Sequence, residues 1–210
     1  MQAGDRGGGV SLMRRRGRRE IAVLAVVLIF GFPQIAALAQ SLATTEEMVK
    51  QLSSLEASAD IDVAALRQQV VDRIKSKANP AALRRPPVAP QLNRLPHLDL
   101  DIRFNPDSPV IRPDSYRTLG RLADAISDPR LLPFGFLIVG HVESSGRRDE
   151  NLTLSQRRAD SFRDALVTTF RISSKRVQAM GLGEEQLLDS QNPKSPVNQQ
   201  IQVLAVRKGP

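Results

Sequence analysis

The sequence predicts an α+β fold in which two main helices pack on one face of a small mixed sheet. Apolar segments of period two alternate along the chain with longer segments of period 3.6, in the order strand, helix, strand, helix, strand, strand. A hydrophobic content of 41% in 210 residues supplies the core of one ordinary domain plus extensions. The chain has no cysteine, so this core must hold the fold without disulfides.

The first 39 residues have the layout of a secretory signal peptide. Six arginines, against Asp5 and Glu20, precede the uncharged residues 21–39, which end in the sequence ALA. We expect cleavage after Ala39. The alternative is a retained membrane anchor, since nineteen apolar residues just reach the length that crosses a bilayer. In both cases the remaining chain is exported, and because this segment carries 6 − 2 = +4 of the net charge of +8, that charge gives little support for a nucleic-acid partner.

Residues 40–78 are predicted to form a helical segment in two pieces, which could pack on each other, on the main domain or on a partner protein. Residues 79–96 contain five prolines and no periodicity, which predicts an extended linker. The apolar residues at helical spacing are Leu42, Met48, Val49, Leu52 and Leu55 in the first piece and Val63, Leu66, Val70, Val71 and Ile74 in the second.

The compact domain is expected at residues 97–206. Its first strand alternates apolar and polar residues, and its second strand is a continuous apolar run typical of a central strand. The first helix opens at Pro113 and should bury Tyr116, Leu119, Leu122, Ala123 and Ile126. The expected elements are strands at 97–104, 134–142, 176–182 and 199–206 and helices at 113–127 and 152–170.

The second helix carries an arginine inside its apolar stripe. Phe162, Ala165, Leu166 and Thr169 define the inward face, and stepping back by three and four residues places Arg158 on it. Its neighbour Arg157 then faces solvent, at about 100° around the helix.

An inward guanidinium cannot lose its proton and must find an acceptor. Glu143, at the end of the central strand, and Asn151, at the helix start, are nearby in the pattern. In one interpretation Arg158 and Glu143 hold a zwitterion between them, the arginine taking a carboxylate and the glutamate an ammonium. In the other they pair with each other and close the loop.

The segment GHVESSGRRDENLTLSQRRA, residues 140–159, resembles the GHTD-x-x-G-(x)₄-N-x-x-LS-x-x-RA signature of the OmpA-like C-terminal domain, the peptidoglycan-associating module of bacterial cell envelopes. FNPDSPVI at 104–111, GLGE at 181–184 and NQQIQV at 198–203 extend the resemblance over the compact domain. It implies an OmpA-like β/α/β/α/β-β sandwich. It also implies a protein of the periplasm or outer membrane of a Gram-negative bacterium.

The resemblance implies non-covalent binding of the meso-diaminopimelate side chain of the peptidoglycan stem peptide, without enzymatic chemistry. By position, Glu143 would meet the ammonium and Arg158 the carboxylate. The other expected ligand-binding residues are Asn151, Asp107, Val142 and Ser155.

Four positions depart from the family pattern. Val142 replaces a threonine, Glu143 replaces an aspartate and is one methylene longer, and Gln199 and Gln200 replace two arginines. We therefore expect binding that is weaker or shifted in specificity. The alternative is a diverged OmpA-like scaffold that docks a protein partner through residues 42–76 without binding the cell wall.

Other classes of protein find little support in the sequence. His141, Ser155 and Glu143 could be imagined as a hydrolytic triad, but Ser155 lies on no nucleophile elbow, so an enzyme is not expected. No cofactor or metal is expected, because His97 lacks partner ligands. The apolar run 21–39 has no acid, unlike the membrane helix of the family's stator proteins, and a lipid-bearing cysteine is absent. A membrane contact is expected only if that run is retained.

Overall fold

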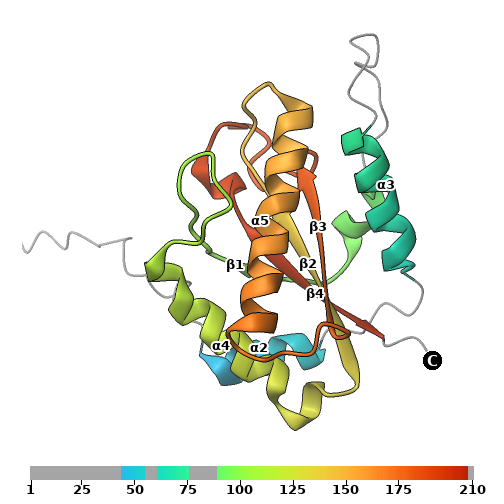
Figure 1. Cartoon of the computed structure of the whole chain (residues 1–210), viewed down its shortest axis with the longest axis vertical. Coiled ribbons are helices and arrows are strands. Elements are labelled where there is room, and N and C mark those ends of the chain that lie inside the picture. The colour runs from blue at the N-terminus through green and yellow to red at the C-terminus, as the bar shows by residue number, and fades with distance from the viewer. Residues whose placement is uncertain (1–43, 55–60, 76–88, 208–210) are drawn as a thin grey trace, which may run out of the picture. The chain divides into compact units, whose positions relative to one another are not determined.

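The structure, a computed structural model, describes residues 44–54, 61–75 and 89–207 (Figure 1). The signal-like segment 1–39 with its cleavage site, the apolar residues Leu42 and Leu55, and the first part of the proline-rich linker lie outside these residues. Within them, no helix combines the length and the apolar character needed to cross a bilayer.

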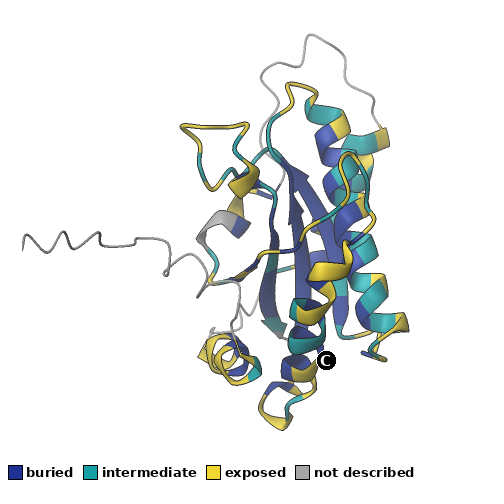
Figure 2. Ribbon diagram, turned by 90° about the vertical axis from the view of Figure 1, so that its left-hand side faces the viewer, coloured by how far each residue is buried: buried dark blue, intermediate teal, exposed yellow. Residues whose placement is uncertain are grey.

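Four strands form one mixed sheet in the order β1-β4-β2-β3. β1 (Leu98–Leu100) pairs antiparallel with β4 (Ile201–Arg207), β4 pairs antiparallel with β2 (Phe134–His141), and β2 pairs parallel with β3 (Val177–Gly183). The mixed sheet and the place of β2 in its interior confirm the sequence prediction, and β2 is buried at every residue after Phe134 (Figure 2).

The first strand is shorter than predicted. Its ladder ends at Leu100, although the alternation continues with Ile102 buried. Phe104 then forms an isolated bridge with Ile111 instead of extending the sheet. The segment predicted as the end of a strand is therefore one side of a closed loop.

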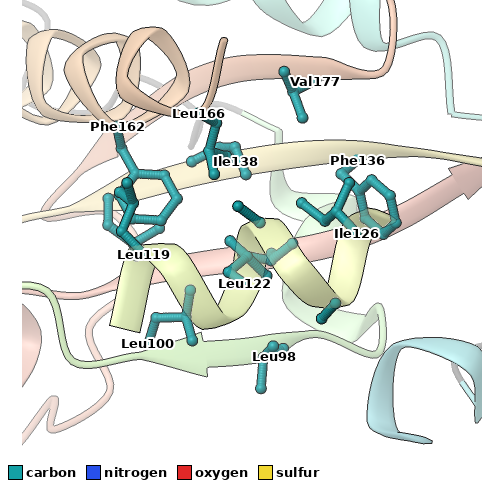
Figure 3. Close-up of a cluster of buried hydrophobic side chains, with 14 of the residues drawn as sticks. Leu98, Leu100, Leu119, Leu122, Ile126, Phe136, Ile138, Phe162, Leu166 and Val177 are labelled. Atoms are coloured by element: carbon teal, nitrogen blue, oxygen red, sulfur yellow. The ribbon is translucent and has the colours of Figure 1, made fainter. Parts of the chain in front are cut away.

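Helices α4 (Tyr116–Ser127) and α5 (Arg148–Thr168) cover one face of the sheet, as predicted. The core between them is drawn in Figure 3, where Phe162 and Leu166 of α5 lie against the side chains of α4 and of the strands. The prediction is wrong for two expected core residues. Tyr116 is 42% exposed because Ser115, one residue earlier, takes the inward position and accepts the backbone amide of Arg103.

Thr169 is also exposed, since α5 ends at Thr168. Conversely, the helix begins at Arg148, one turn earlier than predicted. This earlier start brings Asn151 into the helix.

Helix α3 (Val63–Lys75) covers the opposite face of the sheet, which the sequence left open. Val63, Leu66 and Val70 pack there with side chains of β2, β3 and β4. The linker is not extended at its end, because Pro90–Arg94 form a 3-10 helix, η2, that buries Leu92 in the same cluster. The prediction of an extended linker is therefore wrong for these residues. A covered second face explains why β2 is apolar without alternation.

Helix α2 (Thr45–Ser54) packs beside α4 and η4 (Pro129–Leu131). Thr44 and Glu47 form a capping box, in which each side chain accepts the other's backbone amide. Met48, Val49 and Leu52 join the main core. Of the packing alternatives for residues 40–78, the described residues support packing on the domain, with α2 and α3 in different apolar clusters.

Candidate ligand-binding site

Helix α5 lies unusually close to the ends of β2 and β3, and glycines make this approach possible. A Cβ at Gly181 would stand 2.1 Å from the backbone nitrogen of Gln156, and a Cβ at Gly140 would stand 2.5 Å from the carbonyl oxygen of Ser155. The side chain of Gln156 accepts the amide of Gly181 at 2.8 Å, which fixes the helix against the strand. Arg158 follows half a turn later and is carried to the loop at residues 104–111.

Arg158 is 4% exposed, as predicted, and its neighbour Arg157 is exposed. Its Nε donates to the carbonyl of Ser108 at 3.1 Å, its Nη2 to the carbonyl of Asn105 at 3.5 Å, and its Nη1 to Oε1 of Gln199 at 2.9 Å. The guanidinium also lies 5.0 Å from the centre of the Phe104 ring. All its hydrogen-bond acceptors are uncharged.

This environment leaves the positive charge of Arg158 without a contacting counter-ion. Burial lowers the pKa of the guanidinium, and the charges of Asp107 and Glu143 act in the opposite direction. Among the described residues, no carboxylate forms an ion pair with Arg158. An arginine stays protonated in such a site. Its charge is therefore available to an anionic group that enters from outside.

Gln199 joins the two charged residues that the sequence singled out. Its Nε2 donates to Oε2 of Glu143 at 2.8 Å while its Oε1 accepts from Arg158. The interpretation in which Arg158 and Glu143 pair directly is therefore wrong. In the sequence, Gln199 stands out only as a departure from an arginine of the family pattern, and that departure is the signal that could have placed it in the site.

The loop at residues 104–111 contributes Asp107. The amide of Asn105 donates to the carbonyl of Val110 at 2.9 Å, and the amide of Ser108 donates to the carbonyl of Asn105 at 3.1 Å. Pro106 and Asp107 occupy the two central positions of the resulting turn, with Asp107 in the left-handed region at φ 48°. Arg158 holds two carbonyls of this turn, so the guanidinium also fixes the loop.

These residues surround an open pocket of about 1120 Å³. Five of the six expected ligand-binding residues line it: Asp107, Val142, Glu143, Asn151 and Arg158. The amide of Asn151 is already engaged, since its Oδ1 accepts from Ser145 at 2.7 Å and its Nδ2 donates to Glu184. Asn151 therefore contributes to the shape of the pocket, while its hydrogen-bonding groups are used by Ser145 and Glu184.

Ser155 is the exception and does not reach the pocket. Its side chain is fully buried, and its hydroxyl donates to the carbonyl of Leu152 at 2.9 Å and accepts the amide of Gly183 at 2.7 Å. The expectation that Ser155 binds ligand is therefore corrected: it fastens α5 to the end of β3.

No hydrolytic triad is assembled among the residues described. His141 is buried, its Nε2 lies 2.9 Å from Oε1 of Gln202, and it has no hydrogen bond to Ser155. Burial lowers the pKa of His141 to about 4. His97 contacts Asp99 and the carbonyl of Leu95, and the described residues contain no group of His, Cys, Asp and Glu that could hold a metal ion.

The described residues thus form a small α+β sandwich with an open pocket, whose lining includes Glu143 and the buried Arg158. Residues 103–200 match the model of the OmpA family, and this part of the chain is an OmpA-family domain.

Curated relatives support this assignment. Outer membrane porin F of Pseudomonas aeruginosa is 32% identical over 95 residues, which are 45% of this chain and 27% of the porin. The peptidoglycan-associated lipoprotein of Mesorhizobium japonicum is 34% identical over 84 residues, which are 40% of this chain and 48% of the lipoprotein. The chain thus spans less than half the length of these relatives.

Among solved structures, the OmpA-like domain of FopA1 from Francisella tularensis is similar at a TM-score of 0.45 and 18% identity. The similarity covers 53% of this chain and 72% of that domain.

Proposed function

We propose that this protein binds peptidoglycan in the cell envelope by holding the meso-diaminopimelate of the stem peptide in the pocket at residues 143, 158 and 199. Arg158 takes a ligand carboxylate and Glu143 takes the ammonium. The observation that carries the proposal is the buried Arg158, whose hydrogen-bond partners are all neutral.

The donors of Arg158 fit a carboxylate. A guanidinium has five N–H groups, and the structure engages one on each of its three nitrogens. One N–H therefore remains on Nη1 and one on Nη2, which is the pair that a carboxylate accepts in a two-pronged contact. A ligand carboxylate would also supply the negative charge that the neutral partners lack.

Glu143 completes the site for a zwitterion. It accepts one hydrogen bond from the described residues, at Oε2, which leaves Oε1 for an ammonium. The gap between the two charged groups is spanned by the single amide of Gln199. A ligand whose ammonium and carboxylate are attached to one carbon is comparable in size to this gap.

The relatives support the same function and a place in the envelope. The lipoprotein from Mesorhizobium japonicum is named for its association with peptidoglycan, and the Pseudomonas aeruginosa porin for the outer membrane. We place this protein in the periplasm or attached to the outer membrane, exported by residues 1–39. The proposed binding is non-covalent, so it requires no catalytic residue in the pocket.

Co-sedimentation of the exported protein with purified sacculi tests the proposal. The sharpest variant is Glu143→Gln, which keeps an acceptor for Gln199 and removes only the charge. Arg158→Ala removes the other charge and also releases the loop at residues 104–111. The matched controls are Asp124→Asn and Arg117→Ala, which make the same charge changes at exposed positions of α4 outside the pocket.

We expect both pocket variants to bind sacculi at least about tenfold more weakly, and both controls to bind like the wild type. Circular dichroism must show that each variant is folded. A wild-type protein that stays in the supernatant, or pocket variants that sediment like the controls, would refute the proposal.

The alternative function, a scaffold that docks a protein through residues 42–76, has less support from the structure. The apolar faces of α2 and α3 are used inside the domain. A partner would have to bind the polar faces of these helices or displace them. The same sedimentation assay separates the two functions, since a scaffold without wall binding leaves the wild type in solution.

A further inference from the structure

We infer that Gln199 limits how strongly the pocket prefers a charged ligand carboxyl group, so that a diamino-acid end whose carboxyl group is amidated is rejected less than it would be with a cation at position 199. This inference rests on the proposed function, because it concerns the same pocket. Among the described residues, Gln199 is the side chain that hydrogen-bonds to both Arg158 and Glu143.

The amide of Gln199 has one favourable orientation. Its oxygen faces the donor Nη1 of Arg158, and its nitrogen faces the acceptor Oε2 of Glu143. The reversed orientation would place donor against donor and acceptor against acceptor. The amide therefore hydrogen-bonds to both charged groups and adds no charge of its own.

The backbone that carries Gln199 is held firmly. The side chain of Asn198 is fully buried, donates to the carbonyls of Asp189, Asn192 and Pro193, and accepts the amide of Asp189 at 2.8 Å. The amide of Gln199 itself donates to the carbonyl of Pro196 at 3.0 Å. Gln199 is thus a preorganised positioning residue.

The charges around the pocket explain the selectivity. The charged residues that line the pocket balance, since four arginines stand against four acids and Gln199 contributes nothing. The arginines are Arg112, Arg147, Arg157 and Arg158, and the acids are Asp107, Glu143, Asp149 and Glu150. A cation at position 199, whose side chain contacts Arg158, would bring the sum to +1. With Gln199 the pocket therefore attracts a ligand carboxylate less strongly than it would with an arginine at that position.

An amide group in place of the ligand carboxylate still offers one oxygen to Arg158, but it loses the negative charge and the second acceptor of the two-pronged contact. The ammonium is still received by Glu143. The loss of the charge costs less beside the neutral Gln199 than it would beside an arginine at position 199. We therefore expect the wild type to prefer the acid over the amide by a smaller factor than a variant with a cation at position 199 does.

Isothermal titration calorimetry tests this with two soluble tripeptides that end in meso-diaminopimelate, one with the free carboxyl group and one with that group amidated. The measured quantity is the ratio of their dissociation constants for the exported protein. Gln199→Arg is expected to raise the preference for the free acid about tenfold, or about 1.4 kcal/mol. Gln191→Arg is the matched control, an exposed glutamine of the same loop outside the pocket, and should leave the ratio unchanged.

Gln199→Glu provides an opposite test. Its carboxylate would pair with Arg158 in the place of the ligand carboxylate and would repel Glu143, so both tripeptides should bind at least tenfold more weakly. If Gln199→Arg does not fold, Gln199→Lys makes the same change of charge and is measured instead.

A purely structural Gln199 would make both Gln199 variants lose both tripeptides by similar factors, with the ratio unchanged, and that result overturns the inference. Wild-type binding of the free acid in the same experiment keeps the proposed function. A wild type that binds neither tripeptide overturns both.

Discussion

The substitution Gly181→Ala tests the packing that carries Arg158 to the pocket. The new Cβ would lie 2.1 Å from the nitrogen and 2.6 Å from the Cα of Gln156, and 2.5 Å from Oγ of Ser155. The first two atoms belong to the backbone of α5, so the helix must retreat by more than 1 Å to reach an ordinary contact of 3.4 Å. That retreat stretches the hydrogen bonds to the amides of Gly181 and Gly183, which measure 2.8 and 2.7 Å.

Overpacking of a core costs about 1–3 kcal/mol, and each weakened hydrogen bond about 1 kcal/mol. We therefore expect Gly181→Ala to lower the free energy of unfolding by about 3–5 kcal/mol, measured by urea denaturation. Gly120→Ala is the control, because its Cβ would meet the Phe170 ring at 3.4 Å and lie within α4. Alanine favours a helix, so the control should gain up to about 1 kcal/mol. A loss below about 1 kcal/mol in Gly181→Ala, or equal losses in both variants, would refute the close-packing argument.

Three further substitutions test other parts of the structure. Ser155→Ala leaves the buried amide of Gly183 without its acceptor and should lower the free energy of unfolding, measured by urea denaturation, by about 1–3 kcal/mol. The folded variant should bind sacculi like the wild type. Lost binding at unchanged stability would contradict the structural role of Ser155. Because burial lowers the pKa of His141 from 6.5 to about 4, its contribution to stability is complete above pH 6.5 and is lost toward pH 4, by up to about 1.4 kcal/mol per pH unit. His141→Gln should flatten this dependence, and an unchanged slope in urea titrations at pH 7.5 and 5 would contradict it. Arg130→Ala removes the hydrogen bonds to Glu46 of α2 and should speed amide hydrogen exchange in residues 45–54 but not in β2, most clearly at low salt. A uniform increase in both segments would contradict a role of Arg130 in holding α2 on the domain.

The order of the elements could be predicted because each one carries its own periodicity. Alternation over a few residues and an apolar stripe over several turns are local signals, and they placed the mixed sheet with α4 and α5 on one face. The position of α3 could not be predicted in the same way. Its stripe indicates that one face is buried but not which surface covers it, so the packing on the opposite face of the sheet emerges only in three dimensions.

The site shows a similar division. Arg158 could be found because a charge within an apolar stripe stands out, and Glu143 because it ends the central strand. The acceptors of Arg158 could not, because two of them are backbone carbonyls and carry no side-chain signature. Ser155 shares the stripe of Arg158, but the close approach of α5 turns its hydroxyl to the end of β3 rather than to the pocket.

The chemistry of arginine links the stability of this loop to ligand binding. The carbonyls of Asn105 and Ser108 and the amide of Gln199 lie around one planar group, and each is reached by a different nitrogen of Arg158. A lysine could carry the same charge but has a single nitrogen, so it could not hold the three acceptors and still present a two-pronged face. A carboxylate bound at the two remaining N–H groups would fix the plane of the guanidinium and so strengthen its hold on both carbonyls. Binding of the proposed ligand and closure of the loop at residues 104–111 therefore favour each other.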